Sequence, residues 1–590
     1  MDTTTPSLEL TQAAQALDQS FHAAMARRGA GLSPVSMARA WTDWVLNLAV
    51  SPGTQALLVT QAQRLALDWL GQTRPLTHPS SDAAGDAIPG SLVHALAADA
   101  RFRDPAWRAQ PWQALASANK AWELWWKQAA DLRGMEPHSR EQMHFYAGQW
   151  LDMLSPGNWL ASNPQALQRA LETGGQSLAQ GLSHAVDDWR ERHHLPPLQP
   201  TEAPLSPGAG LAMTEGDVVM RNDLVELIRY HPSTDKVQAE PVLIVPSCIM
   251  KYYILDLSPH NSMVRWLSGQ GHTVYIVSWR NPDENDALLQ FDDYVRHGVL
   301  DPLDHVHTVH QRAVHLTGYC LGGTFTAIAA AALAHRPSAD GPALASLTLL
   351  AAETDFTEPG EMGVLIDNAQ VEMLEHMMAE QGFLSGPQMA GSFQFLHSRD
   401  LVWTRRTQSV LLGEPPYSSD LMVWNADVTR LPAVMHSQHL RQMYLANALA
   451  QGHYEFEGEA VSLRNLHLPM FVVGTAKDHV SPWQSVFKIH QLVDSDVTFV
   501  LTNGGHNAGI VSQPGHPRRH FQMQTTARRQ RRPTPNQWAA TAAHQSGSWW
   551  EAWSSWLGSQ GCGDWQDASA KAEPALYPAP GEYVMTRYED

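Results

Sequence analysis

Cysteine is scarce in this chain. Only Cys248, Cys320 and Cys562 occur among 590 residues. Three such widely separated thiols supply neither a disulfide framework nor a metal-binding spacing. The 29 histidines do not form the paired spacing of a helical zinc motif. We therefore expect no metal site.

Long apolar runs are missing as well. No stretch of about eighteen apolar residues occurs, which predicts that the chain has no transmembrane segment. Residues 1–6 contain no basic segment followed by an apolar one, which argues against a signal peptide and favours a cytoplasmic location. The net charge of −19 argues against binding to nucleic acid.

The composition varies along the chain in a way that predicts two domains. Residues 1–195 have a mainly helical pattern, and residues 196–215 contain a Pro- and Gly-rich linker. Between 216 and 590, strand-like runs such as residues 242–245 and 274–277 alternate with helical ones. This alternation predicts an α/β fold with a parallel sheet and right-handed crossovers, preceded by a helical domain.

The most informative motif is Gly-Tyr-Cys-Leu-Gly at residues 318–322. An apolar run at residues 313–317 precedes it, and a helical run of small residues, 324–335, follows it. Strand, Gly-x-nucleophile-x-Gly and helix form the nucleophile elbow of an α/β-hydrolase, here with Cys320 in place of the usual serine. Side chains at the glycine positions would collide with the neighbouring strand and helix. A structural cysteine in a Gly-rich turn is the alternative interpretation.

Two downstream residues complete a predicted catalytic triad. Asp478 follows a strand-like run at residues 470–474, and His506 follows another at residues 497–501. Nucleophile, acid and histidine occur in the α/β-hydrolase order, each after a strand. Loops at the carboxyl ends of parallel strands lie together, so His506 would deprotonate the thiol of Cys320 and Asp478 would orient the imidazole.

The long interval between nucleophile and acid predicts an inserted cap. From Cys320 to Asp478 is 478 − 320 = 158 residues, whereas a βαβ unit needs about thirty. The excess, about residues 356–432, is rich in Met, Gln and Phe. A cap over the active site would exclude water and protect a thioester intermediate from hydrolysis.

An oxyanion hole is predicted from the loop after the strand that ends near Val245. The backbone N–H groups of Ile249 and Leu321 are the candidate donors. Cys248 in the same loop is interpreted either as a buried structural residue or as a second thiol in the chemistry.

Several longer stretches are typical of one family. They are residues 163–164 (Asn-Pro), 174–178 (Gly-Gly-Gln-Ser-Leu), 246–257 (Pro-Ser-Cys-Ile-Met-Lys-Tyr-Tyr-Ile-Leu-Asp-Leu), 277–283 (Val-Ser-Trp-Arg-Asn-Pro-Asp), 318–323 (Gly-Tyr-Cys-Leu-Gly-Gly), 424–427 (Trp-Asn-Ala-Asp), 477–483 (Lys-Asp-His-Val-Ser-Pro-Trp) and 505–506 (Gly-His). On these stretches the chain resembles the polyhydroxyalkanoate (poly-3-hydroxybutyrate) synthases, and its length and layout resemble class I.

The resemblance implies an acyltransferase that polymerises 3-hydroxyacyl-CoA. Cys320 would take the acyl group and release CoA, and the 3-hydroxyl of the next unit would attack the Cys-bound acyl group. His506 or Asp478 would contact that hydroxyl. No cofactor is implied, because the CoA thioester is the substrate. The implied partners are the growing polyester on its granule surface and a second subunit in a homodimer. A thioesterase or polyester depolymerase on the same fold, and a non-catalytic granule-coating protein, are the alternatives.

Two further features of the sequence each have two interpretations. Tryptophans at 122, 125 and 126 and at 549–556 have helical spacing, for which core packing is the default and contact with a polyester surface the alternative. An Arg-rich segment at residues 518–532 is interpreted as a solvated loop, with attraction of CoA phosphates or of an anionic granule surface as the alternative.

Overall fold

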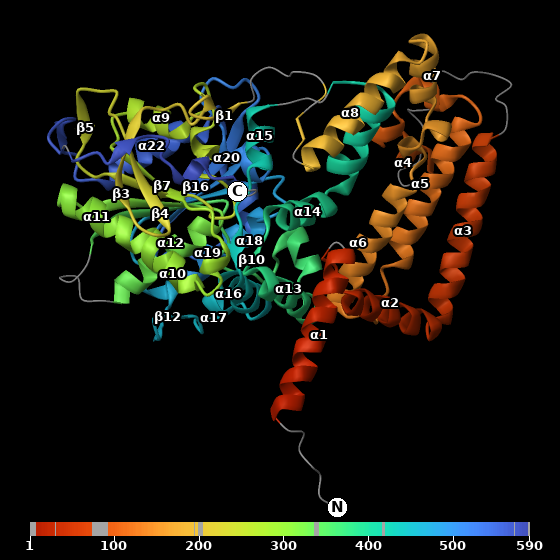
Figure 1. Ribbon diagram of the computed structural model, residues 1–590, viewed down its shortest axis with the longest axis horizontal. Coiled ribbons are helices and arrows are strands. Elements are labelled where there is room, and N and C mark those ends of the chain that lie inside the picture. The colour runs from red at the N-terminus through yellow and green to blue at the C-terminus, as the bar shows by residue number, and fades with distance from the viewer. Residues whose placement is uncertain are drawn as a thin grey trace, which may run out of the picture. The chain divides into compact units, whose positions relative to one another are not determined.

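The computed structural model describes residues 8–29, 31–73, 92–193, 195–196, 198, 205–335, 342–415, 419–571 and 573–587. The chain forms two compact units (Figure 1). Unit 1 contains Met1–Gly31, Leu205–Ala390 and Ser419–Asp590, and unit 2 contains Leu32–Pro204 and Gly391–Ser418. The domain limits expected from the sequence, at 195 and 216 with a cap at 356–432, stay predictions.

Unit 1 is built on an 11-stranded sheet. In spatial order its strands are β17 (Ala543–Ser546), β16 (His520–Thr526), β15 (Val497–Thr502), β14 (Met470–Thr475), β9 (Leu344–Leu350), β8 (Val314–Tyr319), β6 (Val242–Val245), β7 (Val274–Trp279), β4 (Val225–Tyr230), β3 (Gly216–Arg221) and β19 (Tyr577–Pro578). The strands from β15 to β7 in this order are parallel, and the strands outside them pair antiparallel.

The parallel strands form where the sequence is continuously apolar. Every residue of β6, β8 and β14 is buried, as expected for strands that are covered on both faces. The covering helices are α9 (Met263–Gly269), α10 (Phe291–Val295), α11 (Asp301–His310), α12 (Leu321–His335), α18 (Trp483–Phe487), α19 (Ile489–Leu492), α20 (His506–Ile510), α21 (Pro535–Thr541) and α22 (Trp549–Gln560).

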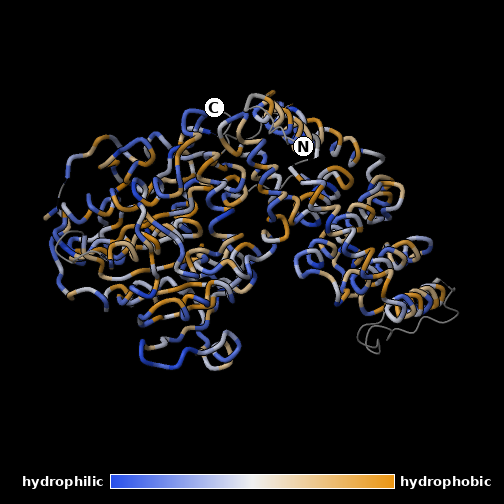
Figure 2. The backbone as a smooth tube through the Cα atoms, turned by 90° about the horizontal axis from the view of Figure 1, so that it is seen from below, coloured by the Kyte–Doolittle hydropathy of each residue, from blue (hydrophilic) through white to orange (hydrophobic). Residues whose placement is uncertain are grey.

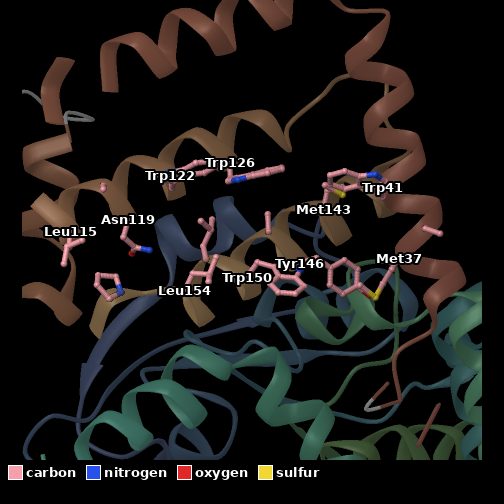
Figure 3. A pocket seen from close by; sticks show the side chains of 15 residues that line it. Met37, Trp41, Leu115, Asn119, Trp122, Trp126, Met143, Tyr146, Trp150 and Leu154 are labelled. Atoms are coloured by element: carbon pink, nitrogen blue, oxygen red, sulfur yellow. The ribbon is translucent and has the colours of Figure 1, made fainter. Parts of the chain in front are cut away.

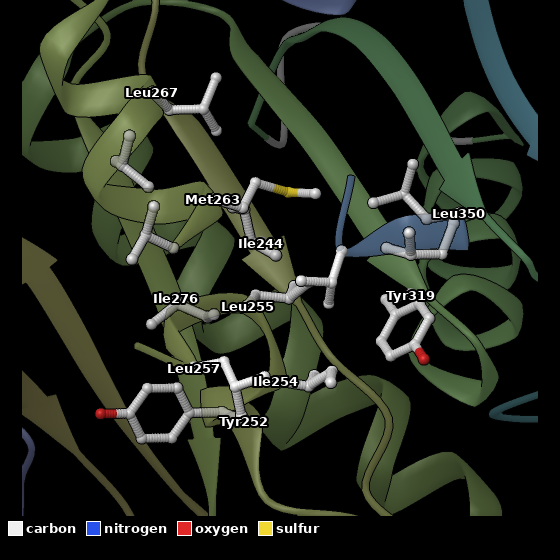
Figure 4. Close-up of a cluster of buried hydrophobic side chains, with 14 of the residues drawn as sticks. Ile244, Tyr252, Ile254, Leu255, Leu257, Met263, Leu267, Ile276, Tyr319 and Leu350 are labelled. Atoms are coloured by element: carbon white, nitrogen blue, oxygen red, sulfur yellow. The ribbon is translucent and has the colours of Figure 1, made fainter. Parts of the chain in front are cut away.

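Figure 4 shows the main core of unit 1, where Met263 and Leu267 of α9 meet Ile244 and Ile276 of the sheet. The tryptophans of α22 belong to the same cluster, and Trp553 Nε1 donates to Thr348 Oγ1 at 3.1 Å. The expectation that this tryptophan set packs in the core is confirmed.

Further helices lie between β9 and β14, which carry the chain from the elbow region to the acid. They are α13 (Asn368–Gln381), α14 (Gly386–Leu396), α15 (Asp420–Ala426), α16 (Ala433–Gln438) and α17 (Ala448–Gln451). The first helix, α1 (Leu8–Arg28), packs on α13 within unit 1, where the rings of His22 and His376 stack at 5.0 Å.

Unit 2 is helical, as the sequence predicts. Its helices are α2 (Pro34–Ala49), α3 (Pro52–Thr73), α4 (Leu92–Ala97), α5 (Trp112–Ala129), α6 (Pro137–Met153), α7 (Pro164–Glu172) and α8 (Gln176–Arg192). Hydrophobic and hydrophilic stretches alternate along them (Figure 2), and Trp44 Nε1 ties α2 to α5 through Ala129 O at 2.8 Å. Among the described residues, none of the helices has the length and apolarity needed to span a bilayer.

Candidate active site

Cys320 lies on a sharp turn between β8 and α12. Its φ is +53°, a left-handed conformation that is strained for a residue with a side chain. A Cβ on Gly318 would lie 2.3 Å from Thr326 Oγ1, and one on Gly322 would lie 2.3 Å from Val245 O. These contacts confirm the steric reason for the flanking glycines, and the turn has the geometry of a nucleophile elbow.

Asp478 lies in the loop after β14, and His506 is the first residue of α20, just after β15; the two strands are parallel neighbours in the sheet. His506 Nδ1 lies 2.9 Å from Asp478 Oδ2 and 3.1 Å from Oδ1. The carboxylate also accepts hydrogen bonds from Thr475 Oγ1 at 2.8 Å and from the backbone N–H of Ser481 at 2.8 Å. The Asp478 side chain has no exposed surface, so its position is fixed by these bonds.

The site stabilises an ion pair between these two groups. Burial alone would raise the pKa of Asp478, but the charge of His506 and the donated hydrogen bonds lower it below its usual value. Burial alone would lower the pKa of His506, but Asp478 and then Cys320 raise it well above its usual value. The pKa of His506 therefore depends on both of its predicted partners. The structure brings Cys320, Asp478 and His506 together.

Neighbouring side chains fix the imidazole. The ring of Tyr319, the residue before the nucleophile, stacks on His506 at 5.7 Å between centroids. Its hydroxyl donates to Asn507 Oδ1 at 2.6 Å, and Asn507 Nδ2 in turn donates to Asn425 Oδ1 at 3.5 Å. This chain of contacts was not predicted from the sequence, although Tyr319 and Asn425 lie within two of the family-typical motifs and Asn507 directly follows a third.

The two predicted oxyanion donors have different surroundings. Leu321 is the first residue of α12, so its N–H has no acceptor within the helix, and no partner for it occurs among the described residues. The N–H of Ile249 donates to Ser247 Oγ at 3.3 Å. The loop around Ile249 is held by α15 and the segment after it, because Trp424 Nε1 of α15 donates to Lys251 O at 2.8 Å and Ile249 O accepts from Thr429 N at 3.0 Å.

Cys248 is buried near Cys320, whereas Cys562 is exposed. Burial, and after it the charge of Cys320, raises the pKa of Cys248 well above its usual value, so this thiol stays protonated. These surroundings favour the structural interpretation of Cys248.

The Arg-rich segment is partly used within the fold. Arg519 donates to Val511 O at 3.0 Å, Arg528 pairs with Asp494 at 2.5 Å, and Arg532 donates to Ser495 O at 2.9 Å. Within the described parts of the chain, no cluster of three or more His, Cys, Asp or Glu residues could hold a metal ion.

Glu353 is a further residue near the site that was not predicted from the sequence. It follows β9, is only 4 % exposed, and the charges of Asp478 and Cys320 act on its carboxyl group. The available signal, as for Asp478, was an acidic residue shortly after a buried strand; the strand before Glu353, β9, also pairs with β8, which ends just before Cys320.

Comparison with known families agrees with this geometry. Residues 98–267 match the family described as poly-beta-hydroxybutyrate polymerase (PhaC) N-terminus, and residues 12–54 match the one described as poly-beta-hydroxybutyrate polymerase N terminal. Residues 241–513 match the alpha/beta hydrolase fold, which confirms the predicted fold. A solved structure that resembles the chain, Paleococcus ferrophilus monoacylglycerol lipase, covers 57 % of this chain and 99 % of its own, with 13 % identity and a TM-score of 0.31.

Two similar proteins cover most of the chain. The Poly(3-hydroxyalkanoate) polymerase of Methylorubrum extorquens is 35 % identical over 510 residues, which cover 85 % of this chain and 83 % of that protein. The Poly(3-hydroxyalkanoate) polymerase subunit PhaC of Cupriavidus necator is 36 % identical over 507 residues, which cover 83 % of each. With this identity over most of both proteins, and with the elbow and its acid and histidine in place, the chain is an enzyme that belongs to the poly(3-hydroxyalkanoate) polymerase family.

Proposed function

We propose that this enzyme polymerises 3-hydroxyacyl-CoA into a polyhydroxyalkanoate, that Cys320 carries the acyl chain, and that CoA is released at each addition. The observation that carries the proposal is the elbow cysteine next to an imidazole that Asp478 orients at 2.9 Å, in a member of a polymerase family. A thiolate suits a thioester substrate, because acyl transfer between two sulfur atoms is nearly balanced in free energy.

In the first step, the thiolate of Cys320 attacks the carbonyl carbon of the thioester. His506 takes the thiol proton, and the ion pair with Asp478 stabilises the imidazolium that forms. The negative oxygen of the tetrahedral intermediate would accept a hydrogen bond from the N–H of Leu321, at the start of α12. Such a donor contributes about 3 kcal/mol to the transition state. The intermediate then expels CoA as a thiolate, which His506 can protonate.

In the second step, the 3-hydroxyl of another unit attacks the carbonyl carbon of the Cys320 thioester, and a base takes the hydroxyl proton. The C–S bond breaks as the C–O ester bond forms, and Cys320 leaves as a thiolate that can attack the next thioester. Asp478 has no exposed surface and binds His506 with both oxygens, whereas the His506 side chain is 13 % exposed. These contacts favour His506 as the base and Asp478 as the group that orients it. The reaction needs no cofactor, because the thioester supplies the leaving group.

We further propose that unit 2 binds the polyester product. α2, α5 and α6 line a groove of about 720 Å³ (Figure 3). Trp122 and Trp126 face it from α5, Trp150 from α6, Leu154 from just after α6, and Trp41 from α2. Trp41, Trp122 and Trp150 are 52 %, 59 % and 58 % exposed, which is unusual for large aromatic side chains unless they contact an apolar partner. A cytoplasmic location at the granule and the homodimer remain predictions.

Labelled 3-hydroxybutyryl-CoA tests the reaction. The purified enzyme should convert the label into polymer with little free 3-hydroxy acid and release one CoA for each unit incorporated. Cys320→Ala should abolish CoA release, and Cys562→Ala, which alters an exposed thiol, should not change it. Free acid in amounts equal to CoA would identify a thioesterase instead. An absence of CoA release from the folded wild-type protein would contradict an enzymatic role on this substrate.

A further inference from the structure

A second carboxyl group lies beside the triad, on the neighbouring strand. Glu353 is three residues beyond the end of β9 (353 − 350), and Asp478 is three residues beyond the end of β14 (478 − 475). The two strands are parallel, and Leu350 pairs with Val473. The loops that carry the two acids therefore leave the sheet next to each other, at the edge where Cys320 lies.

The Glu353 loop is fixed against the elbow. Glu353 O accepts a hydrogen bond from Thr324 Oγ1 of α12 at 2.8 Å, and the N–H of Cys320 donates to Leu350 O at 2.9 Å. The side chain is buried, yet Glu353 Oε1 has no hydrogen-bond partner among the described residues. A buried carboxyl oxygen without a partner is costly for stability alone, so a role at the adjacent site is the better explanation.

The charges around Glu353 keep it neutral while Asp478 is ionised. Burial, then the charges of Asp478 and Cys320, raise the pKa of Glu353 well above its usual value, whereas Ser485 and His506 act in the opposite direction. Tyr444, a half-buried side chain, also senses this carboxyl group, because burial and then the charge of Glu353 raise the pKa of its hydroxyl well above its usual value. Two acids next to one imidazole do not both ionise. Asp478, which accepts more hydrogen bonds, holds the charge.

We propose that Glu353 is a latent second acid, a positioning residue that takes over the pairing with His506 when Asp478 carries no charge. In Asp478→Asn, the main charge that opposes ionisation of Glu353 is absent. Glu353 then releases its proton to solvent, and its carboxylate supports the imidazolium of His506. In the wild-type enzyme the same residue stays protonated and contributes little to the reactivity of Cys320. This inference rests on the proposed role of Cys320 as a nucleophile activated by His506.

A double-mutant cycle on thiol reactivity tests the proposal without the polymerisation substrate. The rate of alkylation of Cys320 by iodoacetamide is measured for the wild-type protein, Glu353→Gln, Asp478→Asn and the double variant, with the labelled cysteine identified by peptide mapping. We expect Glu353→Gln to change the wild-type rate by less than about twofold and the Asp478→Asn rate by about tenfold, since neighbouring groups of one network are coupled. Equal effects in both backgrounds would overturn the proposal.

The pH dependence separates an ionising role from a structural one. Asp478→Asn and the double variant should alkylate at the same rate at low pH and diverge as Glu353 ionises. A ratio that is constant across pH would mean that Glu353 only supports the fold, and the proposal would be wrong. The matched control is Glu358→Gln, which changes a 69 % exposed acid in the same segment. Added to Asp478→Asn, it should leave the alkylation rate unchanged at every pH, so the ratio of the two rates stays at one.

Folding and substrate are controlled separately. Circular dichroism and thermal unfolding of each variant report whether it is folded. Glu353→Leu, which removes the acid without leaving a buried amide, serves as a second variant and should reproduce the Glu353→Gln results. If the wild-type protein alkylates normally and shows the predicted coupling but releases no CoA from 3-hydroxyacyl-CoA, the proposed function fails and the role of Glu353 stands.

Discussion

Replacing Gly322 with alanine should slow acylation of Cys320 about 100-fold, because the elbow has no room for one methyl group. The added Cβ would lie 2.3 Å from Val245 O and 2.4 Å from Pro246 O. Both are backbone atoms, and Pro246 O is fixed by a 2.9 Å hydrogen bond from Trp279 Nε1. A Cβ essentially never lies within 3.0 Å of such an atom, so the elbow must shift by 3.0 − 2.3 = 0.7 Å or more. Misplacing a reacting group by about 1 Å costs on the order of 100-fold in rate.

The assay for this prediction is a single-turnover measurement of CoA release, with circular dichroism to confirm that the variant is folded. Gly269→Ala is the matched control, because this glycine ends α9 in the same unit and its nearest neighbour for an added Cβ, Ser233 Oγ, is 3.8 Å away. Gly269→Ala should acylate at the wild-type rate. If folded Gly322→Ala also does so, the steric account of the elbow is refuted.

Three further changes test other parts of the account. His506→Gln should stop the first turnover, whereas Asp478→Asn should only slow it, because a second acid can still support His506. Single-turnover CoA release measures both. Equal and complete losses in the two variants would exclude a contribution from a second acid. In the folded protein the pKa of Asp478 lies below its ordinary value of 3.8, and the pKa of His506 lies above its ordinary value of 6.5. Their pairing therefore stabilises the fold fully between pH 3.8 and 6.5. This contribution is lost as the pH falls through the lowered pKa of Asp478 or rises through the raised pKa of His506. The difference in free energy of unfolding between wild type and Asp478→Asn, measured in urea, should therefore shrink as pH rises above 6.5, and a constant difference would contradict the ion pair. The double variant Trp122→Ala/Trp150→Ala should bind polyester granules less strongly but acylate normally. Trp565→Ala, at a 55 % exposed position in unit 1, is the control and should change neither property. Undiminished granule binding by the double variant would contradict the proposal that the groove binds the polyester.

Much of the site was predictable from the sequence because each part follows a strand. Cys320, Asp478 and His506 come within four residues of the ends of strands that are wholly or almost wholly buried, and parallel strands deliver their carboxyl ends to one edge. The core role of Trp549, Trp550 and Trp553 followed from helical spacing alone.

Other features depend on contacts that join distant segments, and the sequence pattern does not encode these contacts. Asn507 links Tyr319 to Asn425, across 188 and 82 residues of sequence. Glu353 was missed because its importance lies in burial next to Asp478, whereas in the sequence it is one of many acids. The packing of α1 on α13 joins residues 354 apart in sequence.

The covalent intermediate on Cys320 is the central claim, and mass spectrometry tests it most directly. The enzyme is mixed with one equivalent of 3-hydroxybutyryl-CoA, quenched in acid within the first turnover, digested and mapped. The account predicts a 3-hydroxybutyryl thioester on the peptide that contains Cys320, no adduct in Cys320→Ala, and an unmodified Cys248 in both. Release of CoA by the wild-type enzyme together with an adduct at another residue, or with no adduct at all, would contradict it.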